Sequence, residues 1–170
     1  MLPYAIAATV IYLPLRAVYL QKHRRRFAAP REILLCLFMI VTVAVSSQTV
    51  FTSLSGFSIA HFGHPLNLIP GKTLAQAKIS DYVFLIGLLG NIAVFIPMGF
   101  FLPLLFRKAD FKRTMLFGFS LSLCYELLQL PLDRSTDIDD LILNTLGTLI
   151  GFLLARLLQK CFPKLLSLAN

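Results

Sequence analysis

Residues 82–106 read YVFLIGLLGNIAVFIPMGFFLPLLF, an apolar run without a charged side chain. At 1.5 Å per helical residue this run would be about 37 Å long, which exceeds the roughly 30 Å hydrocarbon core of a bilayer. In lipid, a helix satisfies every backbone polar group within its own segment. The run therefore predicts a membrane-spanning helix, and Pro97 is expected to kink it because proline removes a backbone hydrogen bond.

The composition extends this prediction to the whole chain. Of the 170 residues, 57% are hydrophobic and only 14% are charged, and the mean hydropathy is +0.77. Soluble domains typically contain about 25% charged residues. The sequence therefore predicts an all-α integral membrane helical bundle, which forms a single polytopic domain over residues 1–170.

Four further apolar runs complete the predicted bundle, and each has about the length that a membrane span requires. The predicted spans are Leu2–Leu20, Ile33–Val50, Tyr82–Phe106, Thr114–Leu130 and Leu141–Leu158. If the first run is not a span, four spans remain. The segment Phe51–Asp81 is expected to form a loop on the outer side, because its glycines and prolines interrupt long helices.

The basic residues predict the orientation of the bundle. The net charge of +8 is concentrated in the segments 22–31, 107–113 and 156–164. Loops rich in Lys and Arg remain in the cytoplasm. Five spans, with the N-terminus outside and the C-terminus inside, place all three segments in the cytoplasm, and Arg16 is expected to extend to the membrane interface. Topology and contact with anionic lipid headgroups account for the charge, so no nucleic-acid partner is expected.

The cysteines and histidines do not predict a metal site. Cys36, Cys124 and Cys161 lie in or beside apolar runs and are scattered along the chain, so we expect small buried side chains without a disulfide framework. His61 and His64 lie in a segment rich in Gly and Pro, and a metal site there is only a minor alternative. We expect neither a metal nor a cofactor.

Small and polar residues recur at helical spacing within three of the predicted spans. Residues three or four positions apart lie on one face of a helix. The three stripes are Gly118, Ser122, Glu126 and Gln129; Asp140, Asn144, Gly147 or Thr148, and Gly151; and Gly87 with Asn91. Because lipid gives no reason to expose such faces, we expect them to turn inward and meet. Gly147 and Gly151 would let a neighbouring backbone approach closely.

Charged side chains extend these stripes at one end of the bundle. An ionisable group at membrane depth is costly and suggests a functional site. We place Glu126 near the outer interface, because a charge at a helix centre costs about 2.5–3.5 kcal/mol. Arg134 can reach Glu126 or Asp137, and Asp137 shares a face with Asp140 if the last helix has already begun. Alternatively, these residues only cap that helix and hold a turn. Asp139 is expected to face solvent.

Three motifs occur in a fixed order along the chain. They are Asn67-Leu68-Ile69-Pro70, Asn91-Ile92-Ala93-Val94-Phe95-Ile96-Pro97-Met98-Gly99, and Glu126-x-x-Gln129 followed by Arg134-x-x-Asp137-x-x-Asp140-x-x-x-Asn144-x-x-Gly147. Over about residues 35–155 the chain thereby resembles the VanZ-like family of bacterial integral membrane proteins. Gly71 departs from the family pattern, in which an aromatic residue is common at that position. The resemblance implies a small multi-pass protein of the bacterial cytoplasmic membrane, in a family named for a member associated with teicoplanin resistance.

The first function that we consider is ligand binding at the cell envelope. An outward-facing polar pocket would bind a lipid-linked envelope precursor or a lipophilic glycopeptide antibiotic such as teicoplanin, which carries an acyl chain. The membrane lipids around the chain are further expected partners. The ligand-binding residues would be Asn91, Glu126, Gln129, Arg134, Asp137, Asp140 and Asn144. In this prediction one outward-opening cavity is lined by Glu126, Arg134, Asp137, Asp140 and Asn144, with Asn91 at its floor.

Three alternatives remain open from the sequence. An intramembrane enzyme could modify an envelope lipid or glycan with paired carboxylates, because two carboxylates in different environments can divide the acid and base roles. Its candidate catalytic residues would be Glu126, Asp137 and Asp140. A small lipid transporter would also use polar residues at membrane depth. Finally, the polar stripes could serve only to pack the helices together.

Overall fold

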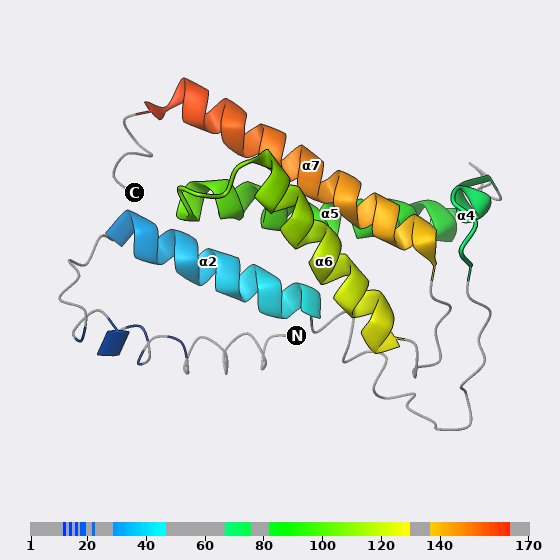
Figure 1. Cartoon of the computed structure of the whole chain (residues 1–170), viewed down its shortest axis with the longest axis horizontal. Helices are drawn as coiled ribbons and strands as arrows, with labels where there is room; N and C mark the ends of the chain where they lie inside the picture. The colour runs from blue at the N-terminus through cyan, green and yellow to red at the C-terminus, as the bar shows by residue number, and fades with distance from the viewer. Residues whose placement is uncertain are drawn as a thin grey trace.

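The apolar runs form the long helices of the computed structural model (Figure 1). The structure describes residues 12, 14, 16, 18, 19, 22, 29–46, 67–75, 82–129 and 137–163. Its helices are α2 (Ala29–Ser46), α4 (Lys72–Ala75), α5 (Tyr82–Leu105), α6 (Phe111–Gln129) and α7 (Ile138–Cys161). These described residues contain no strand and one isolated bridge, between Asn67 and Asp137. The all-α prediction is confirmed, whereas the five spans and the orientation of the termini stay predictions.

Three helices begin earlier than their apolar runs predict. Helix α2 begins at Ala29, α6 at Phe111 and α7 at Ile138, so each gains about one turn at its N-terminus. The predicted spans begin later because hydropathy assigns polar residues to loops, whereas the first turn of a helix accommodates them. Pro30 fits in the first turn of α2 because its missing N–H would have no partner within the helix. Before α6, the carboxylate of Asp110 accepts a hydrogen bond from the backbone N–H three residues later, at 2.8 Å, as an N-cap does.

Two helices of the described chain are long and apolar enough to cross a membrane. They are Leu85–Leu105, which is most of α5, and the whole of α7. The outer faces of the bundle are apolar: Leu116 and Leu127 of α6 are 65% and 54% exposed, and Leu157 of α7 is 58% exposed. Large exposed apolar surfaces are unusual on soluble monomers, whereas lipid accommodates them. Both observations suggest a membrane protein.

Helix α7 is the centre of the packing. It contacts α5 along its length and also packs on α6, while α2 packs on the other side of α5. Figure 1 shows that α5 and α7 run in one direction and that α2 and α6 run in the opposite one. A Cβ on Gly147 or Gly151 would overlap the backbone carbonyl oxygens of Ile92 and Ile96 on α5. The close approach predicted for these two glycines is confirmed.

The prediction for Gly87 is wrong. Gly87 is exposed, and a Cβ there would have no neighbour within 4 Å among the described residues. One turn further along α5, Asn91 already meets Asp140 in the first turn of α7. Gly87 therefore lies beyond the start of α7, where none of the described helices covers it.

The core of the bundle lies where three helices meet. Phe95 and Met98 of α5 pack with Tyr125 of α6, and the rings of Phe95 and Tyr125 meet edge to face at 6.2 Å between centroids. The hydroxyl of Thr42 on α2 lies 3.7 Å from the Met98 sulfur. These contacts hold α2, α5 and α6 together at mid-length.

Arg16 pairs with an acid of α2, and its predicted extension to the membrane interface stays a prediction. Its guanidinium donates to both carboxylate oxygens of Glu32, at 2.8 and 2.9 Å. Glu32 lies in the first turn of α2 and is only 8% exposed. A buried carboxylate requires such a partner, and the two-bond geometry is the strong form of this pair. The pair links a described residue of the first apolar run to α2.

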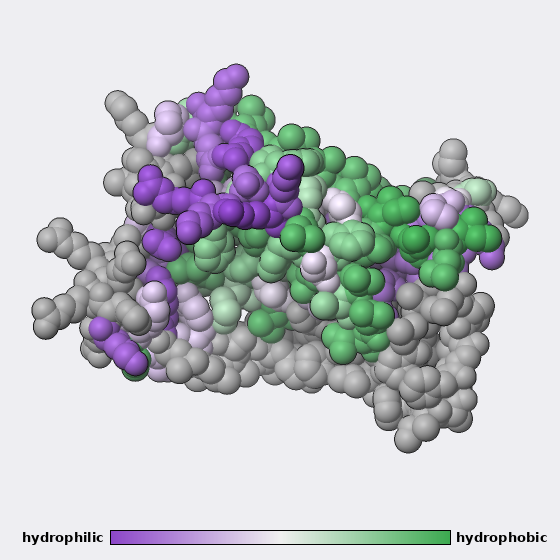
Figure 2. Space-filling model, in the orientation of Figure 1, coloured by the Kyte–Doolittle hydropathy of each residue, from purple (hydrophilic) through white to green (hydrophobic). Residues whose placement is uncertain are grey.

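Hydrophilic residues gather at one end of the molecule (Figure 2). This is the end where α2 begins and where α5 and α7 finish. It carries Arg31 of α2, the Arg107–Lys108 pair that follows α5, and Lys160 in the last turn of α7. Most of the described basic residues thus share one end of the bundle, as the predicted topology requires, whereas Lys72 of α4 lies at the other end.

Candidate functional site

The predicted site residues gather at the opposite end, around the first turn of α7. Asp137 is the N-cap of that helix, and its carboxylate accepts a hydrogen bond from the backbone N–H of Asp139 at 2.9 Å. Aspartate is a preferred N-cap residue because it satisfies one of the free N–H groups there. Asp139 and Asp140 follow in the first turn, where negative charge suits the helix dipole. Helix capping is therefore one role of Asp137.

The segment from Asn67 to Gly71 lies against this first turn. The side-chain amide of Asn67 donates to the Asp137 carboxylate at 3.0 Å, and the carbonyl oxygen of Asn67 accepts from the N–H of Ile138 at 3.0 Å. Gly71 adopts φ +80° and donates its N–H to the Asp139 carboxylate at 2.6 Å. Because residues other than glycine rarely adopt this φ, Gly71 suits the turn. A segment about 70 positions earlier in the chain is thereby fixed to α7.

Asp139 does not face solvent, and that prediction is wrong. Its relative exposure is 0%, because the 67–71 segment covers it and Gly71 bonds to its carboxylate. Helical periodicity alone places Asp139 outside the stripe of Asp140 and Asn144. The sequence marks this segment by the motif Asn67-Leu68-Ile69-Pro70 and by the turn signal of Pro70 and Gly71, but it does not indicate the contact with Asp139.

Two side-chain pairs join the first two turns of α7 to its neighbours. The amide of Asn91 on α5 donates to the carboxylate of Asp140. One turn further, the amide of Asn144 donates to the hydroxyl of Ser122 on α6 at 2.9 Å, and both side chains are buried. The predicted inward orientation of these stripes is confirmed. The pairs set the register of α5 and α6 against α7.

Glu126 connects α6 to the same end of α7. It lies near the C-terminal end of α6 and is 6% exposed. Its carboxylate accepts from the backbone N–H of Asp137 at 3.4 Å. We call the residues joined in this way the polar cluster: Asn67, Asn91, Ser122, Glu126, Asp137, Asp139, Asp140 and Asn144.

Some predicted features fall outside what the structure describes. Arg134 and the pair His61 and His64 lie outside the described residues, and the side chain of Gln129 is likewise not described. The cavity predicted around the cluster therefore stays a prediction. The three cysteines are free; Cys124 and Cys161 are exposed, which differs from the burial we expected, and Cys36 is half-buried.

The chemistry of the polar cluster is that of an acceptor site. Ionised carboxylates only accept hydrogen bonds, and several of them meet at the start of α7. Of these, Asp139 is fully buried and holds the 67–71 segment, whereas Asp137 and Asp140 are half-buried. A ligand that met the cluster would have to present hydroxyl or amine donors.

Sequence comparisons place these residues among known proteins. A model of the family described as VanZ/LLP1 matches residues 32–159, a range that includes the whole polar cluster. The chain is also similar to Protein VanZ of Enterococcus faecium, with 35% identity over 74 residues. That alignment covers 43% of this chain and 46% of the relative, so it spans about half the length of the curated protein. No solved structure matches the chain.

Proposed function

Because the chain belongs to the VanZ/LLP1 family, we propose that it is a multi-pass protein of the bacterial cell membrane that binds an envelope ligand at the polar cluster. The observation that carries this proposal is the meeting of acids and amides from four separate segments. They come from the 67–71 segment, α5, α6 and α7. Polar groups are costly to bury in an apolar membrane bundle, so their presence there suggests a functional site.

The ligand class follows from the chemistry of the cluster and from its depth in the membrane. Hydroxyl and amine groups of a sugar or peptide would donate to Glu126, Asp137 and Asp140. The apolar outer faces of α6 and α7 would lie beside an acyl chain. A lipid-linked envelope precursor and a lipophilic glycopeptide such as teicoplanin both combine these two features. We therefore propose one of these ligands, bound from the outer leaflet.

No contact among the described residues specifically favours the enzyme or the transporter as an alternative. The carboxylates of Glu126 and Asp137 each accept a hydrogen bond from a backbone N–H at the start of α7. These bonds fit a role in positioning that helix at least as well as a role in proton transfer. We therefore retain ligand binding as the proposed function.

The proposal predicts that Glu126→Gln and Asp140→Asn lose envelope protection. Expressed in a susceptible bacterium, the wild-type protein should raise the inhibitory concentration of teicoplanin several-fold, and the two variants should not. Purified wild-type protein should also bind labelled teicoplanin more tightly than either variant. Asp110→Asn is the matched control, because Asp110 is an exposed helix-start acid at the other end of the bundle. Variants indistinguishable from wild type in both assays would refute the proposal.

The proposal also requires that the polar cluster faces the outside. Ile69 is 62% exposed beside Gly71, so a cysteine there reports the side of the membrane. In a protein whose three native cysteines are replaced, Ile69→Cys should react with a membrane-impermeant maleimide added to intact cells. Lys108→Cys, at the basic end, should react only after the cells are permeabilised. The reverse pattern would overturn the proposed topology and the outer-leaflet ligand together.

A further inference from the structure

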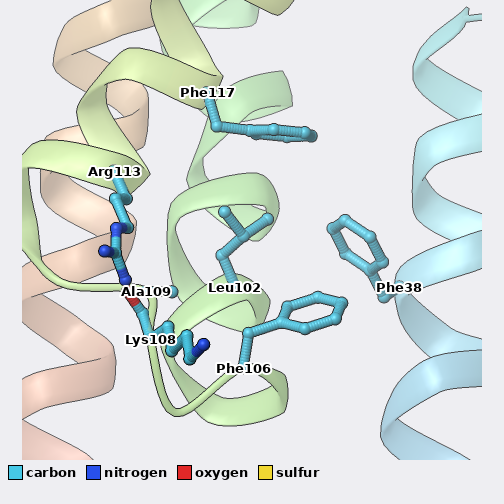
Figure 3. Close-up of a pocket in the computed structure, with 7 residues that line it drawn as sticks. All are labelled: Phe38, Leu102, Phe106, Lys108, Ala109, Arg113 and Phe117. Carbon is cyan, nitrogen blue, oxygen red and sulfur yellow. Dashed lines mark hydrogen bonds between the residues drawn. The ribbon is translucent and has the colours of Figure 1, made fainter.

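An apolar pocket lies at the basic end of the bundle, far from the polar cluster. It has a volume of about 380 Å³ and lies between α2, α5 and the start of α6. Figure 3 shows Phe38 pointing from α2 toward Leu102 of α5 and Phe106 just after that helix, with Phe117 of α6 above them. Its size falls within the range of pockets that hold ligands. The pocket is wide and apolar enough for a lipid chain.

Cationic side chains surround the mouth of this pocket. Lys108 and Arg113 belong to its lining. A second pocket of about 210 Å³ shares Phe106 and Lys108 with the first and adds Arg31 and Arg107. The two pockets are therefore adjacent: one is apolar, and the other is lined by basic residues from α2 and from the turn between α5 and α6.

The nearby acids offset these cations only in part. Glu32, which follows Arg31, is bound to Arg16, and Asp110 is a single acid beside the four cations that line the two pockets. The guanidinium of Arg113 donates to the carbonyl oxygen of Lys108 at 2.7 Å, which is a neutral acceptor. Within the described chain, Arg16 and Glu32 form the only ion pair. The pocket rim therefore keeps a positive charge.

Arg31 adds a second, independent indication of an anion. Its Nε is buried and meets no acceptor among the residues that the structure describes. A buried donor without an acceptor costs free energy, so such groups usually have a partner. A phosphate oxygen would supply that acceptor, and guanidinium groups are suited to phosphate.

We propose that this double pocket is a binding site for an anionic phospholipid of the cytoplasmic leaflet. One acyl chain enters the apolar pocket between Phe38, Leu102 and Phe106, and the phosphate lies among Arg31, Arg107, Lys108 and Arg113. Anionic lipids are attracted to basic juxtamembrane segments in general. The geometry is more specific than such a general attraction. The apolar pocket, which fits an acyl chain, adjoins the cationic pocket, and both are lined by Phe106 and Lys108.

The test is lipid selectivity of the purified full-length protein. Reconstituted in neutral phosphatidylcholine nanodiscs, the wild-type protein should bind fluorescent phosphatidylglycerol at least about tenfold more tightly than fluorescent phosphatidylcholine, a difference of about 1.4 kcal/mol. Lys108→Gln and Arg107→Gln, both at exposed positions, should each remove most of this preference. Glycerol phosphate without acyl chains should not compete, because it cannot occupy the apolar pocket.

Lys112→Gln is the matched control. Lys112 is exposed and belongs to the same basic segment, but it does not line either pocket. Loss of binding in Lys108→Gln with little change in Lys112→Gln supports a discrete site. Equal losses in both variants would show only a diffuse attraction between charges, and equal binding of phosphatidylcholine would show an apolar pocket without headgroup recognition. Either result overturns the proposal, as does competition by free glycerol phosphate.

Discussion

Replacing Gly151 with alanine is expected to destabilise the folded bundle by about 1–3 kcal/mol, toward the upper end of the range for overpacking. The new Cβ would overlap the carbonyl oxygen of Ile96 and lie 2.7 Å from the backbone nitrogen of Phe100. Both are backbone atoms inside α5, so no side-chain rotation relieves the overlap. The two helices would have to separate, and denaturant unfolding in mixed micelles would measure the loss.

Two other glycines provide matched controls for this substitution. A Cβ on Gly87 has no described neighbour within 4 Å, so Gly87→Ala should leave the stability unchanged or raise it, because alanine favours helix over glycine. At Gly118 the Cβ would meet the buried side chain of Thr148, whose hydroxyl donates to the carbonyl oxygen of Asn144. We expect a loss of stability there as well. If Gly87→Ala and Gly151→Ala shift the free energy of unfolding equally, close approach of α5 and α7 contributes nothing to stability.

The contact between α5 and α7 also controls the polar cluster. Gly147 and Gly151 fix how closely the two helices approach, and Asn91 then meets Asp140 one turn or more away. Interfaces of this kind use small residues because lipid provides no hydrophobic force to hold helices together. Stability and ligand geometry therefore depend on the same pair of helices.

The sequence predicted the long helices because hydropathy alone defines them. A long run without charge, such as Tyr82–Phe106, has few alternatives in lipid. The inward stripes were also predictable, since spacing along one helix shows which residues share a face. Helix starts were less predictable: residues 29–32 and 111–113 carry charges that hydropathy assigns to loops, although the first turn of a helix accommodates them.

The environment of Asp139 could not be predicted from its own helix. What covers it is the 67–71 segment, a contact across almost 70 positions of sequence. Local periodicity contains no information about such a contact. The same limit applies to Glu32, whose partner Arg16 lies in the preceding apolar run. Both residues are carboxylates buried by a segment that is distant in sequence.

Replacing Asp139 with alanine is expected to release the 67–71 segment from α7. The variant removes the acceptor that lies 2.6 Å from the Gly71 N–H and leaves space at a site that is 0% exposed. Hydrogen bonds to charged groups contribute about 1.5–3 kcal/mol, so the loss should be of this order. Hydrogen exchange would detect it as faster exchange of the Gly71 amide, and proteolysis would detect it as cleavage near Lys72.

Two variants separate this contact from a general effect of removing an acid. Asp139→Asn keeps an acceptor oxygen at the same position and should retain much of the protection of Gly71. Asp110→Ala removes an exposed acid that bonds only to its own helix start in the described contacts, and it should leave the Gly71 amide as protected as in the wild type. Because Asn67 of the same segment also holds Asp137, Asp139→Ala should further weaken the proposed ligand binding although Asp139 itself cannot touch a ligand. Full protection of Gly71 in Asp139→Ala would mean that Asn67 and Asp137 hold the segment without it.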